Sequence, residues 1–154
     1  MNERVTESSK VVQAFPPRST SSAETKYNGS VDGNTVVGID TMNYDEALIM
    51  LQIGAISGTL DVTVLDSSID DDSTGATAIT GAAFAQVTGA VSPSVGQDGV
   101  YVGSILTKNT KRYLYVKAVT ATAAAKVFGV NVLLTRADGP KPVTQAQTVA
   151  FQVN

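Results

Sequence analysis

The sequence predicts an all-β fold, an antiparallel β-sandwich or jelly roll of about eight strands. Apolar and polar side chains alternate with a period of two along most apolar segments, where β-branched residues are frequent, and no stretch has helical periodicity. The chain has 154 residues, the size of one domain. It is 43% hydrophobic and 16% charged, which is too apolar for a disordered chain and too lightly charged for a helical bundle.

Residues 1–26 are expected to form an extended N-terminal arm, ahead of a sandwich domain at residues 27–137. The segment is rich in serine, threonine and charge. The adjacent prolines Pro16 and Pro17 exclude a helix there and favour an extended backbone at Phe15. Together with the preceding valines, Phe15 gives the arm an apolar surface, so we predict that Phe15 is an interaction residue.

The first strong strand is expected at residues 59–66, after a weak strand near residues 36–39. Its inward face is formed by Leu60, Val62 and Val64. Residues 47–53 are expected to be its hairpin partner across the short turn Ser57-Gly58. That run is apolar on both faces, which suits a central strand covered on both sides, or one covered by a neighbouring subunit.

Further strands are expected at residues 78–87 (weak), 100–106, 111–119 and 127–134. In the third and fourth of these, alternate apolar residues share one face. The inward residues of these strands are Leu114, Val116, Val130 and Val132. We predict that they are buried together with the inward face of residues 59–66.

Residues 138–154 are expected to form an extended C-terminal arm. The Gly139-Pro140-x-Pro142 break prevents it from continuing the preceding strand. Beyond the break, Val149, Phe151 and Val153 alternate with more polar residues, and exposed apolar area costs about 25 cal/mol per Å². We predict that these three residues bind a sheet edge of another subunit, and that the domain folds without them.

The composition argues against catalysis. The chain has no histidine or cysteine and no tryptophan, which removes disulfides, thiolate and imidazole metal sites, and the Ser-His and Cys-His nucleophile pairs. There is no glycine-rich phosphate loop and no Gly-x-Ser-x-Gly motif. We expect no enzyme activity, no cofactor and no metal.

The charge argues against nucleic acid and membranes as partners. The net charge is −3 and the pI is about 4.8, which does not favour nucleic acid or an anionic membrane surface. No secretory signal is visible, and no apolar run approaches the roughly 20 residues of a membrane span. We expect a soluble protein that is made in the cytoplasm.

The charges are separated along the chain. Residues 27–107 contain acids but no lysine or arginine, whereas residues 108–141 are basic with Asp138 as the one acid. Acidic and basic strands that pair within one fold explain this pattern. Two electrostatically distinct surfaces, suited to side-by-side assembly, also explain it. With the apolar run at residues 47–53, the second interpretation predicts a homodimer or homotrimer.

Three clusters of polar residues have a possible chemical role. The Asp66–Asp72 loop contains oxygen ligands for calcium, but it lacks the EF-hand spacing and also fits a solvated turn. The carboxylates of Asp45, Glu46 and Asp61 have no aromatic residues around them to stack on a sugar, which argues against glycoside hydrolysis. The basic, tyrosine-containing segment 108–117 resembles a base-stacking platform, but its alternation fits a sheet face better.

The order of these segments resembles the capsid decoration, or cement, proteins of tailed bacteriophages, which have jelly-roll or β-sandwich folds. The resemblance covers residues 47–136. It depends on the run Gly-Thr-Leu-Asp-Val-Thr-Val-Leu-Asp-Ser-Ser with its inward Leu60, Val62 and Val64, the acidic loop that follows, and Arg112-Tyr113-Leu114 opening the later strand. None of these residues is catalytic in such proteins.

The resemblance implies a non-enzymatic virion protein that binds the outer surface of a capsid and stabilises it. Its partners would be the major capsid protein and further copies of itself, and terminal arms would reach across neighbouring capsomers. The C-terminal arm would then bind another subunit or the capsid lattice. An alternative is a carbohydrate- or receptor-binding β-sandwich module of a phage tail or fibre.

Overall fold

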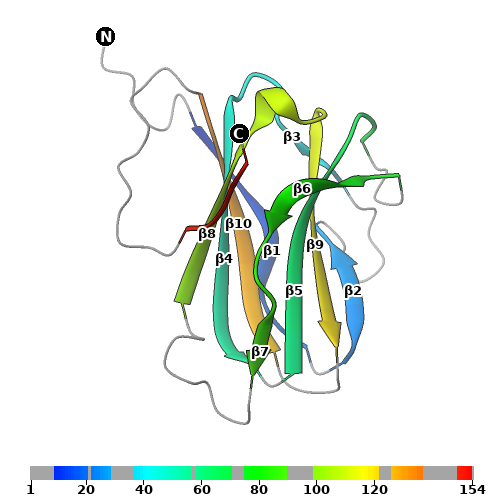
Figure 1. Cartoon of the computed structure of the whole chain (residues 1–154), viewed down its shortest axis with the longest axis vertical. Helices are drawn as coiled ribbons and strands as arrows, with labels where there is room; N and C mark the ends of the chain where they lie inside the picture. The colour runs from blue at the N-terminus through cyan, green and yellow to red at the C-terminus, as the bar shows by residue number, and fades with distance from the viewer. Residues whose placement is uncertain are drawn as a thin grey trace.

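The computed structural model describes residues 9–20, 22–28, 37–56, 58–70, 75–89, 99–121, 126–136 and 149–153. Within these residues the chain forms eleven strands and one short 3-10 turn. The strands make two sheets packed face to face, a two-layer β-sandwich (Figure 1). The predicted all-β sandwich is therefore confirmed, with more strands than the sequence predicted.

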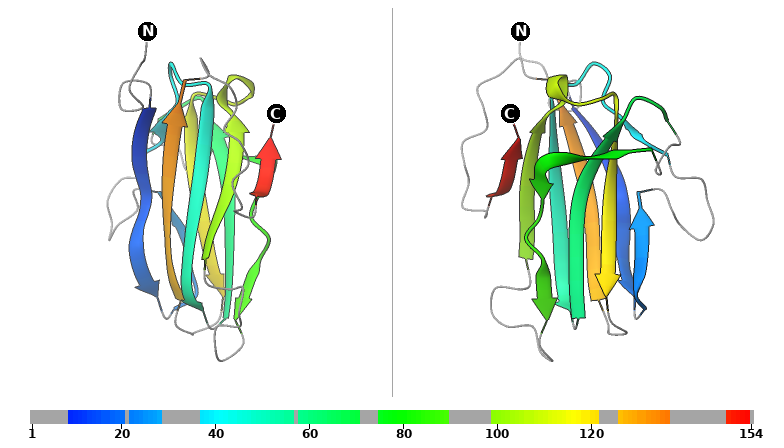
Figure 2. Two further views of the ribbon diagram at one scale, coloured as in Figure 1. Left: turned by 90° about the vertical axis from the view of Figure 1, so that its left-hand side faces the viewer. Right: turned by 45° about the vertical axis from the view of Figure 1, so that its right-hand side comes forward.

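The first sheet, sheet A, has five strands in the order β1-β10-β4-β8-β11. All neighbours are antiparallel except β11, which runs parallel to β8. The left panel of Figure 2 looks onto the outer face of this sheet. Its strands are β1 (Ser9–Thr20), β4 (Glu46–Ile56), β8 (Gly99–Leu106), β10 (Lys126–Thr135) and β11 (Val149–Val153).

The second sheet, sheet B, has the order β2-β9-β5-β6, with the short β3 paired to β9 and the short β7 paired to β5. The 3-10 turn η1 (Thr107–Asn109) follows β8 and leads towards β9. The strands of sheet B are β2 (Glu24–Tyr27), β3 (Ile39–Asp40), β5 (Gly58–Ser67), β6 (Thr77–Ala83), β7 (Val87–Gly89) and β9 (Tyr113–Ala121).

The core lies between the two sheets and contains the predicted inward residues. Each of them is at most 1% exposed, which confirms the assignment of inward faces: Leu60, Val62, Val64, Leu114, Val116, Val130 and Val132. One tyrosine on the opposite face of β9 is also fully buried. Tyr115 lies under the backbone of Gly38 and donates a hydrogen bond from its hydroxyl to the Ile69 carbonyl, at 3.2 Å.

The predicted hairpin between residues 47–53 and 59–66 is wrong. β4 belongs to sheet A and β5 to sheet B, so the chain crosses from one layer to the other between Ile56 and Gly58. Gly58 has a φ of 105°, which only glycine adopts without strain. A tight turn between apolar strands has the same sequence signature whether it stays in one sheet or joins two, so alternation alone did not distinguish the two arrangements.

Much of the predicted N-terminal arm is part of the sandwich. Residues 9–20 are extended, as expected, but they form β1, which pairs with β10 along its length and has register shifts around Phe15. Phe15 is 2% exposed and its ring lies 5.9 Å from that of Phe128. The segment is extended because it completes sheet A, and Phe15 fills the core of its own subunit.

The C-terminal strand also completes the sandwich of its own subunit. β11 pairs with β8, and Phe151 packs edge-on against Phe84 with ring centroids 4.8 Å apart. The prediction that this segment binds another subunit or the capsid lattice is therefore wrong for the described strand. The edge of β8 offers the backbone hydrogen-bonding partners and the apolar space that an extended segment requires. The C-terminal segment of the same chain occupies both. Among the described residues, no helix is long and apolar enough to cross a membrane.

Candidate functional site

The residues predicted to bind a partner lie in the sandwich and do not form a common surface. Phe15 is on β1 at one edge of sheet A, and Phe151 and Val153 are on β11 at the opposite edge. Phe15 and Phe151 belong to the core, and Val153 packs against it. The backbone of Val149 pairs with Val102, and its side chain lies outside the described part of the structure. The rings of Phe15 and Phe151 are therefore buried in their own subunit and not exposed to a partner.

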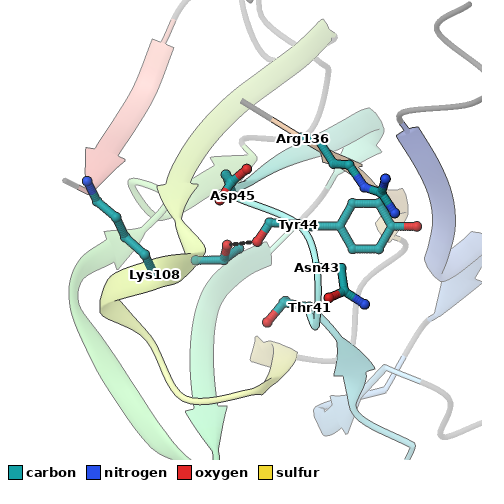
Figure 3. A pocket seen from close by; sticks show the side chains of 7 residues that line it. Thr41, Asn43, Tyr44, Asp45, Lys108 and Arg136 are labelled. Carbon is teal, nitrogen blue, oxygen red and sulfur yellow. Dashed lines mark hydrogen bonds between the residues drawn. The ribbon is translucent and has the colours of Figure 1, made fainter. Parts of the chain in front are cut away.

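One polar hollow lies at the end of the sandwich near η1 (Figure 3). It has a volume of about 450 Å³. It forms beside the turn Thr41–Tyr44, in which the Tyr44 N–H donates to the Thr41 carbonyl at 3.0 Å and Asn43 has a φ of 70°. Asparagine tolerates this left-handed conformation better than most residues. The lining residues are Thr41, Asn43, Tyr44, Asp45, Thr107, Lys108 and Arg136.

Hydrogen bonds to the backbone hold this hollow in shape. The Thr107 hydroxyl donates to the Tyr44 carbonyl, and the Thr107 N–H donates to the Asp45 carbonyl at 3.0 Å. The Asp45 N–H in turn donates to the Thr135 carbonyl at 2.9 Å. The Lys108 side chain extends away from the other labelled side chains (Figure 3). The charged groups do not converge on one point, so the hollow has the character of a polar surface depression.

An ion pair fixes the chain just before this turn. Arg112 donates from Nε to Asp40 Oδ1 at 3.0 Å and from Nη2 to Oδ2 at 2.7 Å, and its guanidinium lies 5.1 Å from the centre of the Tyr113 ring. The hydrogen bond from Arg112 lowers the pKa of Asp40 below its ordinary value of 3.8. The same contact raises the pKa of Arg112. This pair anchors β3 to the start of β9.

The acids of the loop after β5 have structural contacts in the described part of the chain. Asp66 accepts the Lys111 N–H at 3.0 Å and lies 3.5 Å from the Lys111 ammonium. Asp70 accepts the Gly38 N–H at 2.8 Å. No group of three or more acids suited to a metal ion occurs among the described residues. Asp71 and Asp72, which complete the acidic loop considered for calcium, lie outside the described residues.

These contacts also connect the acidic and basic parts of the chain. Asp66 and Asp40 come from the acidic segment, and their partners Lys111 and Arg112 come from the basic segment. Pairing within the fold therefore explains part of the charge separation. Tyr113 and Tyr115 lie on the same face of β9. Tyr115 is fully buried and therefore not available for base stacking.

A groove of about 610 Å³ runs between the edge of sheet A and the edge of sheet B. One wall is β1 from Lys10 to Ala14, and the other contains Val37, Ile39 and Asp70. Lysine at an edge and the prolines later in β1 disfavour pairing with another strand. The edge of β1 is therefore protected against extension of the sheet.

The outer face of sheet A carries several apolar side chains among the described residues. Alternation along the strands points them away from sheet B, and none belongs to the core cluster. Val11 is 67% exposed, Val100 40% and Val127 39%. We call this surface the outer A face. Its apolar residues are the exposed Val11, Val100 and Val127, the half-buried Leu48, Met50, Leu106 and Leu133, and Val102, which is buried at 8% exposure.

The outer A face is almost without charge. Among residues with described side chains, Glu46 is the charged residue on it, and its carboxylate accepts a hydrogen bond from the Ser104 hydroxyl. Its other polar residues are uncharged: Ser9, Gln13, Gln52, Ser104, Asn131 and Thr135. The sequence indicated part of this surface, because residues 47–53 are apolar on both faces.

The outer face of sheet B differs in chemistry. Asp61 accepts two hydrogen bonds of 2.9 Å from the Gln86 amide, and the Lys117 ammonium lies 6.0 Å from the centre of the Tyr27 ring. Threonines occupy the neighbouring outward positions of β5. Polar outward residues are usual where an antiparallel sheet faces water. Among the described residues, the outward Leu65 and Tyr115 of sheet B are buried, and the outer A face departs from the polar pattern over several strands.

Comparison with known proteins adds no family. No protein-family model matches the chain, and no curated protein is significantly similar to it.

Proposed function

We propose that this protein is a non-enzymatic structural protein of a tailed-bacteriophage virion, a cement protein that binds the outer surface of the capsid and stabilises it. It would be made in the host cytoplasm and would act on the assembled shell. Its partners would be the major capsid protein and further copies of itself. The observation that carries the proposal is the outer A face, because a sheet face that is largely apolar and almost without charge is typical of a protein that works within an assembly.

The contrast between the two outer faces supports this class of function. An exposed apolar side chain is unremarkable alone, but a contiguous patch on one face indicates a binding surface. The described polar clusters are engaged in holding loops and strand ends, as the Arg112–Asp40 and Lys111–Asp66 contacts show. They support a rigid binding module better than a catalyst.

The sandwich is also suited to mechanical reinforcement. Its two layers share one continuous core, and the strands nearest the two chain ends, β1 and β11, form the two edges of sheet A. Force applied to either edge is then borne by ladders of backbone hydrogen bonds. A protein that tightens a shell needs this resistance to deformation.

The direct test uses shells assembled from the major capsid protein of a tailed bacteriophage. Purified protein is added to shells that lack it, the mixture is sedimented, and bound copies are counted by quantitative mass spectrometry. We expect saturable binding at many copies per shell and a higher temperature of shell disruption. Copies in small number, with binding to host cells or glycans, would favour the receptor-binding alternative and overturn the proposal.

A further inference from the structure

We infer that the outer A face is the interface of a symmetric homodimer, in which a second copy of this chain packs its own outer A face against the first. The inference concerns the same surface that carries the proposed function and assigns it to the contact between copies of this chain, and it is tested separately because self-association is measured without capsids.

The distribution of side chains on the outer A face matches the anatomy of a protein interface. Leu48 and Met50 of β4 and Leu133 of β10 lie on two of the three inner strands of sheet A, with Leu48 directly opposite Leu133 in the register. Uncharged polar residues lie at its border, as Ser9 does on β1, and also among its apolar residues, with Gln52 on β4, Asn131 opposite Met50 and Ser104 opposite Leu48. Apolar side chains with few charges among them are usual in the central part of a protein interface.

Charge favours a second copy as the occupant. Each chain has a net charge of −3, so two copies repel each other unless they meet through uncharged surfaces. The described aspartates lie elsewhere, for example Asp61 on the outer face of sheet B and Asp40 near the end of the sandwich. A strongly charged partner would find Glu46 as the one charged group with a described side chain on the outer A face, whereas an identical, nearly uncharged face fits it better.

The dimensions of sheet A suit a dimer. Five strands spaced about 4.8 Å apart make a sheet about 24 Å wide, and strands of the observed lengths average about 30 Å. The face therefore covers roughly 700 Å², close to the roughly 800 Å² that each partner buries in a standard interface. Two sheets stacked in this way lie about 10 Å apart, as the two layers within one sandwich do.

The edges of sheet A are less suited to self-association than its face. At one edge the outermost strand is the short β11, which contacts β6 of sheet B. At the other, β1 contains Pro16 and Pro17, and Lys10 lines the adjoining groove. Face-to-face stacking with two-fold symmetry is thus the arrangement that the molecule favours, and it is closed, so it stops at two copies.

The first experiment is sedimentation velocity on the full chain over a range of concentrations. We expect a species of twice the chain mass of 15.9 kDa. Met50→Lys places a charge at the centre of the interface and should raise the dissociation constant by about 30-fold or more, the effect of an interface hot spot. Thr59→Lys, the matched control on the outer face of sheet B, should leave the dimer intact.

A second experiment does not depend on that variant folding well. Because the chain has no cysteine, single cysteines can be introduced at Leu48, Met50 or Leu133 and oxidised. At least one that lies near the two-fold axis should form a covalent dimer, since a disulfide requires Cα atoms within about 7 Å. Thr59→Cys should remain monomeric at the same protein concentration.

Two results would overturn the inference. One is a chain that sediments at the monomer mass at all concentrations and gives no cross-link at the three positions. The other is a defined trimer, or a dimer that Met50→Lys leaves unchanged while the variant melts cooperatively. Capsid binding by such a monomer would leave the proposed function intact, so the two proposals fail separately.

Discussion

The ring of Phe151 lies directly over the backbone of Gly103. A Cβ atom at residue 103 would be 2.1 Å from Cζ of that ring and 2.3 Å from Cε1, far inside the contact distance of two carbon atoms. The absence of a side chain on β8 therefore creates the space in which the aromatic residue of β11 is buried. This pair couples the edge of sheet A to the core.

Gly103→Ala should destabilise the protein by about 2–3 kcal/mol, because the added methyl group forces Phe151 out of its place. Urea denaturation measures the loss. Gly99→Ala on the same strand is the matched control, since a Cβ there meets no atom within 4 Å, and it should be nearly neutral. In a Phe151→Ala background the cost of Gly103→Ala should largely disappear. A full cost in that background would contradict the coupling.

Ending the chain after Thr144 should lower the free energy of unfolding by about 3 kcal/mol or more, because it removes the buried Phe151 ring. Thermal melting with and without an added peptide of residues 145–154 checks this. The peptide should raise the melting temperature of the truncated chain by mass action, and a peptide with Phe151→Ala should not. A truncated chain as stable as the full one would show that β11 adds nothing to the fold.

The sequence predicted the faces of individual strands well and their partners poorly. Leu60, Val62 and Val64 alternate with polar residues, and alternation reports directly which side of a strand is buried. Whether β4 pairs with β5 depends on the path of the chain at Gly58, which local pattern does not contain. Likewise, the alternation of apolar residues in β11 predicted that this segment pairs with a sheet edge. No local feature of the sequence identified that edge as β8, the strand that contains Gly103.

The candidate surface was predictable only in part. Leu48 and Met50 stand out within residues 47–53 because they occupy the face that a half-buried strand would fill with polar residues. Leu133 and Val102 become part of the same surface only through the register of β10 and β8 with β4. The polar hollow near η1 escaped prediction because its residues come from three separate segments.

Val116→Asp should prevent folding. Val116 is 1% exposed between the two sheets, and an unpaired carboxylate there costs several kcal/mol. Circular dichroism should show loss of the cooperative melting transition. Ala121→Asp, an exposed position near the end of the same strand, serves as the control and should melt near the parent. A folded Val116→Asp protein would mean that the inward face of β9 is assigned incorrectly.

The Asp40–Arg112 pair should contribute a small stability that depends on pH. Because the pKa of Asp40 is lowered in the folded protein, its contribution is complete above the ordinary value of 3.8 and is lost as the pH falls through the lower folded value. Asp40→Asn should therefore reduce the melting temperature by less than about 3 °C at pH 7, as for a solvent-accessible pair. The difference should vanish in strong acid, and a constant difference at all pH values would contradict this origin.

Calcium should leave the melting temperature unchanged, as should a chelator. The carboxylates of Asp66 and Asp70 already accept the N–H groups of Lys111 and Gly38, which leaves a poor ligand set for a hard cation. Differential scanning calorimetry with millimolar calcium is the measurement. A rise of several degrees would show that the loop binds the ion, since a ligand of the folded state stabilises it.

The crossing of the chain between layers after Ile56 has a consequence for the route to the native state. Consecutive strands seldom pair, so most ladders join segments that are far apart in the chain. β1, for example, pairs with β10, which lies near the opposite end of the sequence. Loop-closure entropy must be overcome before such contacts contribute, and topologies of this kind reach the native state on millisecond-to-second timescales. While the chain folds, the apolar faces of β4 and β10 are exposed and can contact other chains.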